Sequence, residues 1–154
     1  MAGDLDLDFE TAFEAEPPAG FDPDAAAALA RCALGREGAT GRWAVTLALV
    51  HDDRLRALHR DFMGVDTPTD VMTFPTDDPD LDGGGDIVIS VDRAAEQAPE
   101  YGLDAADEVT FLLVHGLLHL CGWDDTDPET RQRMLARQSQ LIASCATQSA
   151  TPAS

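Results

Sequence analysis

The chain has 154 residues, a length that suits one domain and leaves no room for two of ordinary size. Hydrophobic residues make up 44% of it and charged residues 25%, close to the globular average, which excludes a wholly disordered chain. The formal net charge is -19 and lysine is absent, so there is no general attraction for nucleic acid. Any contact with RNA must therefore depend on a local patch of the surface or on a metal ion.

The start of the chain and its cysteines bear on the cellular compartment. No stretch approaches the roughly 20 apolar residues of a membrane span. The acidic residues 1–16 lack the basic and apolar regions of a secretory signal, so we expect a cytoplasmic protein. Cys32, Cys121 and Cys145 are odd in number and widely spaced, which predicts reduced thiols.

Two terminal segments differ from the rest in composition. Residues 1–20 form an acidic N-terminal arm, and the Pro17-Pro18 pair prevents a helix from continuing through its end. Acidic and apolar residues alternate from 4 to 9, which favours a first strand with one buried face slightly over disorder. The polar residues 147–154 predict a disordered tail. The functional domain is then 21–146.

Between these segments the hydrophobic pattern predicts alternating helices and strands. Asp22 is an expected N-cap, with Pro23 in the first helical position. The expected elements are a helix to Gly35, a strand 43–51, a helix 54–62, a strand 71–74 after a turn at Pro68, an acidic loop 77–85, a buried strand 86–91, and helices 92–101, 104–120 and 127–144. This order predicts an α+β fold, in which helices cover a small mixed sheet.

One segment of the last helices indicates a metal site. His115 and His119 are four residues apart, so their rings lie on the same face of a helix and could bind one ion. Gly122 allows the chain to turn back, which makes Asp125 the expected third ligand, ahead of Asp124. Three protein ligands leave a fourth position for water, as in catalytic sites. The alternatives are a buried pair of histidines and an aspartate that only stabilises a turn.

The spacing is that of the metzincin peptidases with two changes. Gly116 stands where those enzymes have the glutamate that acts as general base, and Asp125 stands in place of the third histidine. The missing glutamate argues against peptide hydrolysis. A metal ion can itself stabilise the charge that develops during phosphodiester cleavage, so this reaction is favoured.

Three motifs together resemble a known family. Residues 115–124, HGLLHLCGWD, are similar to the H-G-x-L-H-L-x-G-Y-D-H signature of the YbeY family, bacterial single-strand metallo-endoribonucleases of ribosomal RNA maturation. Residues 68–75, PTDVMTFP, resemble its P-T-D-V-L-S-F-P motif, and 85–90, GDIVIS, resemble its G-D-I-x-I strand, which a glutamine follows, here Gln97. The likeness extends from about Trp43 to Leu141.

The resemblance implies an activity and its partners. It implies a zinc ion in a cleft beside a small mixed sheet, cleavage of single-stranded RNA, and a role with ribosomal particles in 16S rRNA 3′-end maturation and ribosome quality control. The alternative is a non-catalytic ribosome-assembly factor with a structural metal, which the high negative charge favours.

The chain departs from the family at three positions. Asp125 replaces the third histidine, and its negative charge should weaken the Lewis acidity of zinc and favour harder ions such as Mn²⁺. Met63 replaces an arginine that is thought to hold RNA, and His59 replaces an asparagine. His59 and Arg60 are therefore the candidates for RNA binding, with Arg56 a further substitute for the missing arginine.

No general base is identifiable from the sequence, which leaves a metal-bound water as the reactive group. Asp70 and Asp86 are carboxylates that could orient a ligand histidine or that water. The alternatives are a turn-stabilising role for Asp70 and a strand-start role for Asp86.

Overall fold

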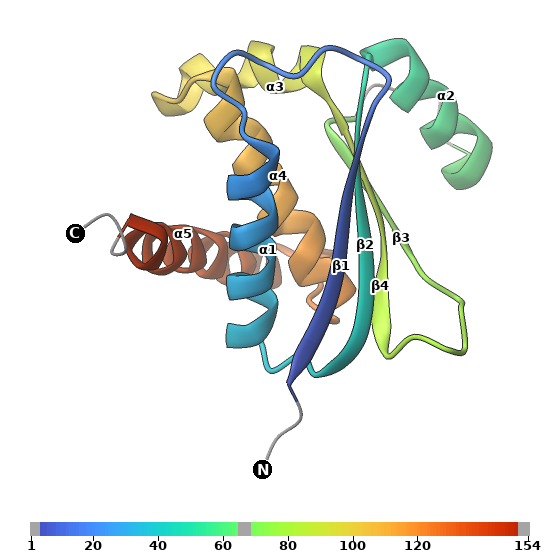
Figure 1. Ribbon diagram of the computed structural model, residues 1–154. Helices are drawn as coiled ribbons and strands as arrows, with labels where there is room; N and C mark the ends of the chain where they lie inside the picture. Colours follow the sequence, from blue (N-terminus) through green and yellow to red (C-terminus); the bar gives the residue numbers. More distant parts are fainter. Residues whose placement is uncertain (1–3, 65–68, 151–154) are drawn as a thin grey trace.

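The computed structural model describes residues 4–64 and 69–150, which form four strands and six helical segments (Figure 1). In chain order the elements are β1 (Leu5–Phe13), α1 (Pro23–Arg36), β2 (Gly41–Val50), α2 (Asp52–Met63), β3 (Val71–Pro75), β4 (Gly83–Ser90), α3 (Val91–Gln97), the 3₁₀ helix η1 (Ala98–Tyr101), α4 (Ala105–Leu120) and α5 (Pro128–Ala150). The predicted turn at Pro68 and residues 151–154 of the predicted tail lie outside the described residues.

The strands form one mixed sheet in the order β1-β2-β4-β3. Both β1 and β4 run parallel to β2, whereas β3 pairs antiparallel with β4. Together with the helices, this sheet confirms the predicted α+β fold. Since β3 is an edge strand, Asp70, which immediately precedes it, lies at the border of the sheet, opposite β1.

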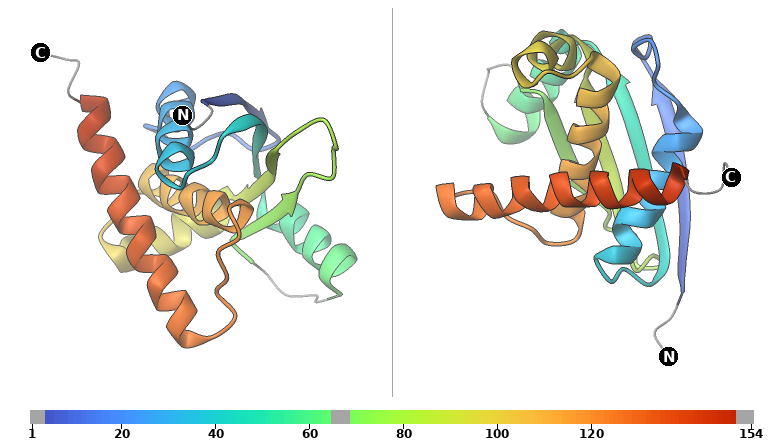
Figure 2. Two further views of the ribbon diagram at one scale, coloured as in Figure 1. Left: turned by 90° about the horizontal axis from the view of Figure 1, so that it is seen from below. Right: turned by 90° about the vertical axis from the view of Figure 1, so that its left-hand side faces the viewer.

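Helices cover both faces of the sheet, but unequally (Figure 2). On one face α1 and α4 pack against the strands and α5 crosses both helices. Leu47, Ile87 and Leu113 are among the fully buried residues of the main core between these layers. On the other face α2 encloses a small cluster, in which Leu55 packs with residues of the strands. The larger layer therefore fixes the position of α4, which carries both candidate histidines.

The first strand shows why the acidic segment can join the fold. Leu7 is buried, while its neighbours Asp6 and Asp8 are exposed. Successive residues of a strand point to opposite faces, so the apolar side chains meet the helices and the carboxylates face water. Charges on an edge strand also discourage pairing with another chain. The division of the chain into an arm, a domain and a tail stays a prediction.

Several helix and strand ends differ from the predicted positions. Asp22 caps α1 as expected, because its side chain accepts a hydrogen bond from the Asp24 N–H at 3.0 Å. The predicted helix 92–101 divides into α3 and η1 at Pro99, which has no N–H to continue the α-helical pattern. The strand β4 begins at Gly83, three residues before the predicted start, where glycines approach the neighbouring strands closely.

The prediction of three reduced cysteines is wrong. Cys32 of α1 and Cys145 of α5 form a disulfide with a Cα–Cα distance of 5.9 Å, and Cys121 is a free thiol. The two cysteines are 113 residues apart in the sequence and meet because α5 crosses α1, a packing that the spacing of cysteines does not reveal. In the described part of the chain, no helix is long and apolar enough to span a membrane.

Candidate metal centre

The position of α4 against β4 explains why the sequence has a glycine between the two histidines. A Cβ atom at Gly116 would lie 2.7 Å from Cγ2 of Ile87, far inside van der Waals contact. The face of α4 that carries residue 116 thus packs directly on the sheet, and a glutamate there would have no room. A peptidase-type general base is therefore excluded at this position by packing as well as by sequence.

The end of α4 reverses the chain as the sequence predicts. Gly122 adopts a positive φ of 98°, its N–H donates to the carbonyl of His119, and the N–H of Trp123 donates to the carbonyl of Leu118, each at 3.0 Å. This is the Schellman pattern, in which a left-handed residue satisfies the last carbonyl groups of a helix. The reversal brings Asp125 back beside the rings.

Three ligand atoms converge at this point. Nε2 of His119 lies 3.1 Å from Nε2 of His115, and Oδ2 of Asp125 lies 3.4 Å from the latter and 3.6 Å from the former. A tetrahedral ion with ligand bonds of about 2.0–2.1 Å separates its ligand atoms by about 3.3–3.4 Å. The observed spacing brackets that value, so the three side chains fit a divalent ion. Among the described residues, His115, His119 and Asp125 form a cluster that could hold a metal ion.

Hydrogen bonds on the far side of each ring set the tautomers. Nδ1 of His119 lies 3.0 Å from the carbonyl oxygen of Trp123, and Nδ1 of His115 lies 2.9 Å from Oε1 of Gln138. Both partners are acceptors, so each Nδ1 carries a hydrogen and each Nε2 presents a lone pair. The amide of Gln138 is oriented in turn by its Nε2, which donates to the carbonyl of Phe111 at 3.4 Å. Two lone pairs and a carboxylate oxygen therefore face one another, an arrangement that a cation between them would stabilise.

Sequence reasoning missed Gln138 as part of the site. It is fully buried and lies on α5, 23 residues beyond His115. A polar residue on the buried face of an amphipathic helix was the available signal, because buried polar groups need a partner.

The loop after α4 is anchored from the opposite side. Nε1 of Trp123 donates to Oε1 of Glu37 at 2.6 Å, and the other carboxylate oxygen of Glu37 accepts from Nε of Arg137 at 2.6 Å. These bonds join the loop to the end of α1 and to α5. They hold the Trp123 carbonyl in place for His119.

Among the described residues, the neighbouring Asp124 and Cys121 are not part of this cluster. The carboxylate of Asp124 accepts hydrogen bonds from the N–H and the hydroxyl of Thr126, which leaves Asp125 to face the rings. Burial, together with the charge of Glu37, raises the pKa of Cys121 to about 11, so its thiol stays protonated at neutral pH.

Two cavities flank the cluster. The first, of about 670 Å³, lies toward α3, η1 and α5, and the second, of about 460 Å³, lies toward α2 and β3. Both are lined by His115, Asp125 and Asp70, and the second also by His59 and Met63. The cluster therefore separates two spaces that a chain-like substrate could occupy on either side of it.

Two predicted residues are not brought to the cluster. Arg60 is exposed and pairs with Asp61 at 3.2 Å, and it lines neither cavity. Asp86 is exposed on β4 next to Ile87, which points toward α4, so Asp86 lies on the opposite face of the sheet.

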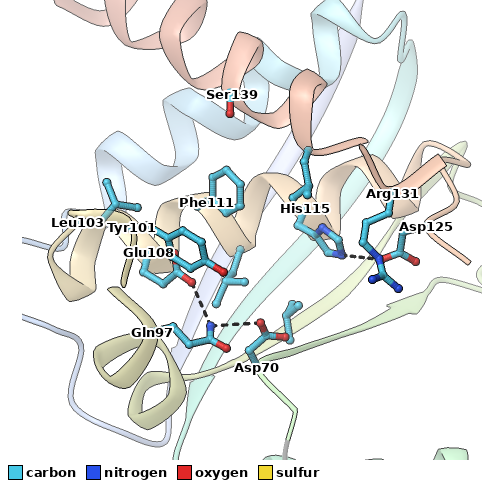
Figure 3. A pocket seen from close by; sticks show the side chains of 13 residues that line it. Asp70, Gln97, Tyr101, Leu103, Glu108, Phe111, His115, Asp125, Arg131 and Ser139 are labelled. Carbon is cyan, nitrogen blue, oxygen red and sulfur yellow. Dashed lines mark hydrogen bonds and ion pairs between the residues drawn. The ribbon is translucent and has the colours of Figure 1, made fainter. Parts of the chain in front are cut away.

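A polar network continues from Asp70 into the first cavity (Figure 3). Nε2 of Gln97 donates to Oδ2 of Asp70 at 3.3 Å and to Oε2 of Glu108 at 3.0 Å. Burial of the Glu108 side chain raises its pKa, the bond from Gln97 lowers it by a smaller amount, and the charge of Asp70 raises it.

Comparisons with a solved structure, with curated relatives and with a family model agree with one another. The fold is similar to the solution structure of TM1509 from Thermotoga maritima, with a TM-score of 0.59 and 23% identity over 95% of this chain and 93% of that one. The chain is 39% identical to Endoribonuclease YbeY of Salinispora tropica over 84% of this chain and 91% of the relative, and 42% identical to Endoribonuclease YbeY of Carboxydothermus hydrogenoformans over 71% and 76%. Residues 22–146 match the family model described as Endoribonuclease YbeY. The chain therefore belongs to the YbeY family of endoribonucleases.

Proposed function

We propose that the protein is a zinc-dependent endoribonuclease of the cytoplasm that cleaves single-stranded RNA in 16S rRNA 3′-end maturation and ribosome quality control. Its ligands for the ion are His115, His119 and Asp125. Membership of the family supports the nuclease activity. The proposed partners of the protein are ribosomal RNA and ribosomal particles.

The observation that carries the proposal is the convergence of two imidazole nitrogens and one carboxylate oxygen within 3.6 Å of one another. Three electron-rich atoms at this spacing repel one another unless a proton or a cation lies between them. The tautomers fixed by Gln138 and by the Trp123 carbonyl favour a cation, since they direct both Nε2 lone pairs inward.

When bound, a zinc ion would supply Lewis acidity to a phosphodiester and stabilise the negative charge that develops on its oxygens. The chain contributes the rest of the site. Asp70 lines both cavities, so its carboxylate could orient a water molecule for attack on the phosphorus. Gln97 holds that carboxylate at 3.3 Å from the side opposite the cluster. The anionic Asp125 lowers the net positive charge of the centre, which favours Mn²⁺ as an alternative ion.

The test combines metal content with cleavage. The purified full-length protein, loaded with zinc or with Mn²⁺, should bind one ion per chain and cleave a single-stranded RNA oligonucleotide faster than the same sequence in a duplex. His115→Ala should lose both the ion and the cleavage, whereas the matched control His51→Ala, on the surface beside Asp92, should keep both. A stoichiometrically loaded protein that cleaves no single-stranded RNA would contradict the proposal.

A second candidate function is a non-catalytic ribosome-assembly factor with a structural metal. The charge of -19 favours it, as does Met63, which is 64% exposed at the position of the family's RNA-holding arginine. Sedimentation with ribosomal particles, run beside the cleavage assay, distinguishes the two. Binding to particles without cleavage by any metal-loaded preparation would favour the assembly factor.

A further inference from the structure

A buried carboxylate forms part of the floor of the larger cavity beside the metal cluster. Glu108 lines it, although the residue is only 2% exposed. One carboxylate oxygen, Oε2, accepts a hydrogen bond from Gln97, but the other, Oε1, is buried without a hydrogen-bond partner in the described part of the chain. Leaving such a buried atom without a partner is destabilising. One oxygen of this carboxyl group therefore has no partner among the described residues.

The walls of the cavity are aromatic and apolar. Phe111 is half-buried on α4, and Tyr101, at the end of η1, is 68% exposed although it lines the cavity. Figure 3 shows Tyr101 and Glu108 at the end of the cavity away from His115 and Asp125. An exposed aromatic ring beside a polar floor is suited to stacking against a planar ligand.

The charges at the two ends of the cavity favour different parts of a nucleotide. The floor carries Glu108 and the nearby Asp70, which disfavours a phosphate there. Arg131 lines the cavity and lies toward the end with His115 and Asp125, where a phosphate would be favoured (Figure 3). A nucleobase is neutral and planar and carries N–H donors, so it meets the demands of the floor and walls. The volume of about 670 Å³ lies within the range of small-molecule sites.

We propose that this cavity binds one nucleobase of the RNA substrate, next to the phosphate at the metal cluster, with the ring packed against Tyr101 and Phe111 and a base N–H donating to the carboxylate of Glu108 once that side chain turns toward the cavity. The inference rests on the proposed endoribonuclease function for the identity of the ligand. It explains preference for single-stranded RNA, because a base in a duplex is stacked and paired and cannot enter the cavity.

The test uses the single tyrosine of the chain. Full-length protein labelled with 3-fluorotyrosine gives one ¹⁹F resonance, from residue 101, which reports directly on the cavity. Titration with AMP, GMP, CMP and UMP should shift this resonance saturably for at least one of them, whereas ribose 5-phosphate, which has no base, should not. If none of the four nucleotides shifts it, or if ribose 5-phosphate shifts it equally, the inference is overturned.

Variants then locate the hydrogen bond. Glu108→Leu should weaken nucleotide binding about tenfold or more, since it removes the acceptor but keeps an apolar filling. Glu108→Gln preserves the shape and should change the order of preference among the four bases. Glu100→Gln, on the exposed surface of η1, is the matched control and should bind as the unaltered protein does. Unchanged affinity and base order in both Glu108 variants would contradict the assigned contact.

Cleavage by the zinc-loaded protein separates this inference from the proposed function. In a single-stranded oligonucleotide, an abasic nucleotide at one position flanking the cleaved bond should lower kcat/KM about tenfold or more, and abasic nucleotides farther away should not. If no abasic position changes kcat/KM, the proposed base-binding site is wrong, but the proposed nuclease activity still stands. Saturable nucleotide binding without any cleavage would support the base site and count against the nuclease.

Discussion

The side-chain oxygen of Gln138 lies 2.9 Å from Nδ1 of His115, so a fully buried amide on α5 orients a ring on α4. The two residues are 23 positions apart, and the packing of α5 against α4 brings them together. This contact makes the geometry of the cluster depend on a residue that touches no ion itself. The helix that follows the candidate metal-binding segment is therefore part of the candidate site.

Removal of this contact should weaken metal binding without altering a ligand. Gln138→Leu leaves Nδ1 of His115 without its acceptor, so the ring loses its fixed tautomer and orientation. We expect zinc affinity to fall about 10- to 100-fold, as measured by competition with a chromophoric chelator. The control is Gln132→Leu on the exposed side of α5, which should bind zinc normally. Equal zinc affinities for the two variants would show that Gln138 has no such role.

A methyl group at position 116 should destabilise the fold. Gly116→Ala places a Cβ 2.7 Å from Cγ2 of Ile87, so α4 or the strand must move. We expect a loss of about 1–3 kcal/mol in the free energy of unfolding, measured by urea denaturation. Gly35→Ala, where no atom lies within 4 Å of the added Cβ, should leave stability unchanged or raise it by about 0.4–1 kcal/mol. A Gly116 variant as stable as the Gly35 variant would contradict the close packing described here.

The raised pKa of Glu108 should make stability depend on pH in a definite direction. Above its ordinary pKa of 4.5 the carboxyl loses its proton in the unfolded chain, whereas burial keeps it protonated to a higher pH in the folded chain. The folded state then binds more protons, so the free energy of unfolding decreases as the pH rises through this interval.

Urea denaturation of Glu108→Gln measures this contribution. The variant cannot titrate at this position, so its stability relative to the unaltered protein should increase as the pH rises above 4.5. Glu100→Gln, on the surface, should follow the unaltered protein. Parallel pH profiles for the Glu108 variant and the unaltered protein would argue against the raised pKa.

The disulfide between α1 and α5 should contribute measurably to stability. Cys145→Ser removes the link that Cys32 and Cys145 make across 113 residues. We expect the free energy of unfolding to fall by about 2–4 kcal/mol, measured without reductant. Cys121→Ser is the control, because that thiol is free. If dithiothreitol leaves the denaturation midpoint of the unaltered protein unchanged, the cysteines are not linked in solution.

The sequence alone led to the histidine pair and the reversal at Gly122, because both are local. Four-residue spacing places two rings on one helix face, and a glycine at the helix end provides the positive φ that the turn requires. The first strand was predictable for the same reason, since the alternation of apolar and acidic residues within it is local. The triple glycine that starts β4 was not, because it has no side chains to show a pattern.

What the sequence could not reveal are contacts between distant segments. Gln138 and the disulfide both depend on how α5 crosses the other helices, and no periodicity encodes that crossing. Arg60 was a candidate for RNA binding by sequence position, yet its direction on α2 turns it toward Asp61. Glu108 escaped notice because a charged residue in the first turn of a helix is usually exposed.

The most direct test of the metal centre is an anomalous-difference map at the zinc edge from crystals of the zinc-loaded protein. The account predicts one peak per chain within about 2.0–2.2 Å of Nε2 of His115, Nε2 of His119 and a carboxylate oxygen of Asp125. It would be contradicted by a peak at another position, or by a map in which Asp125 turns into solvent and leaves the two rings without an ion.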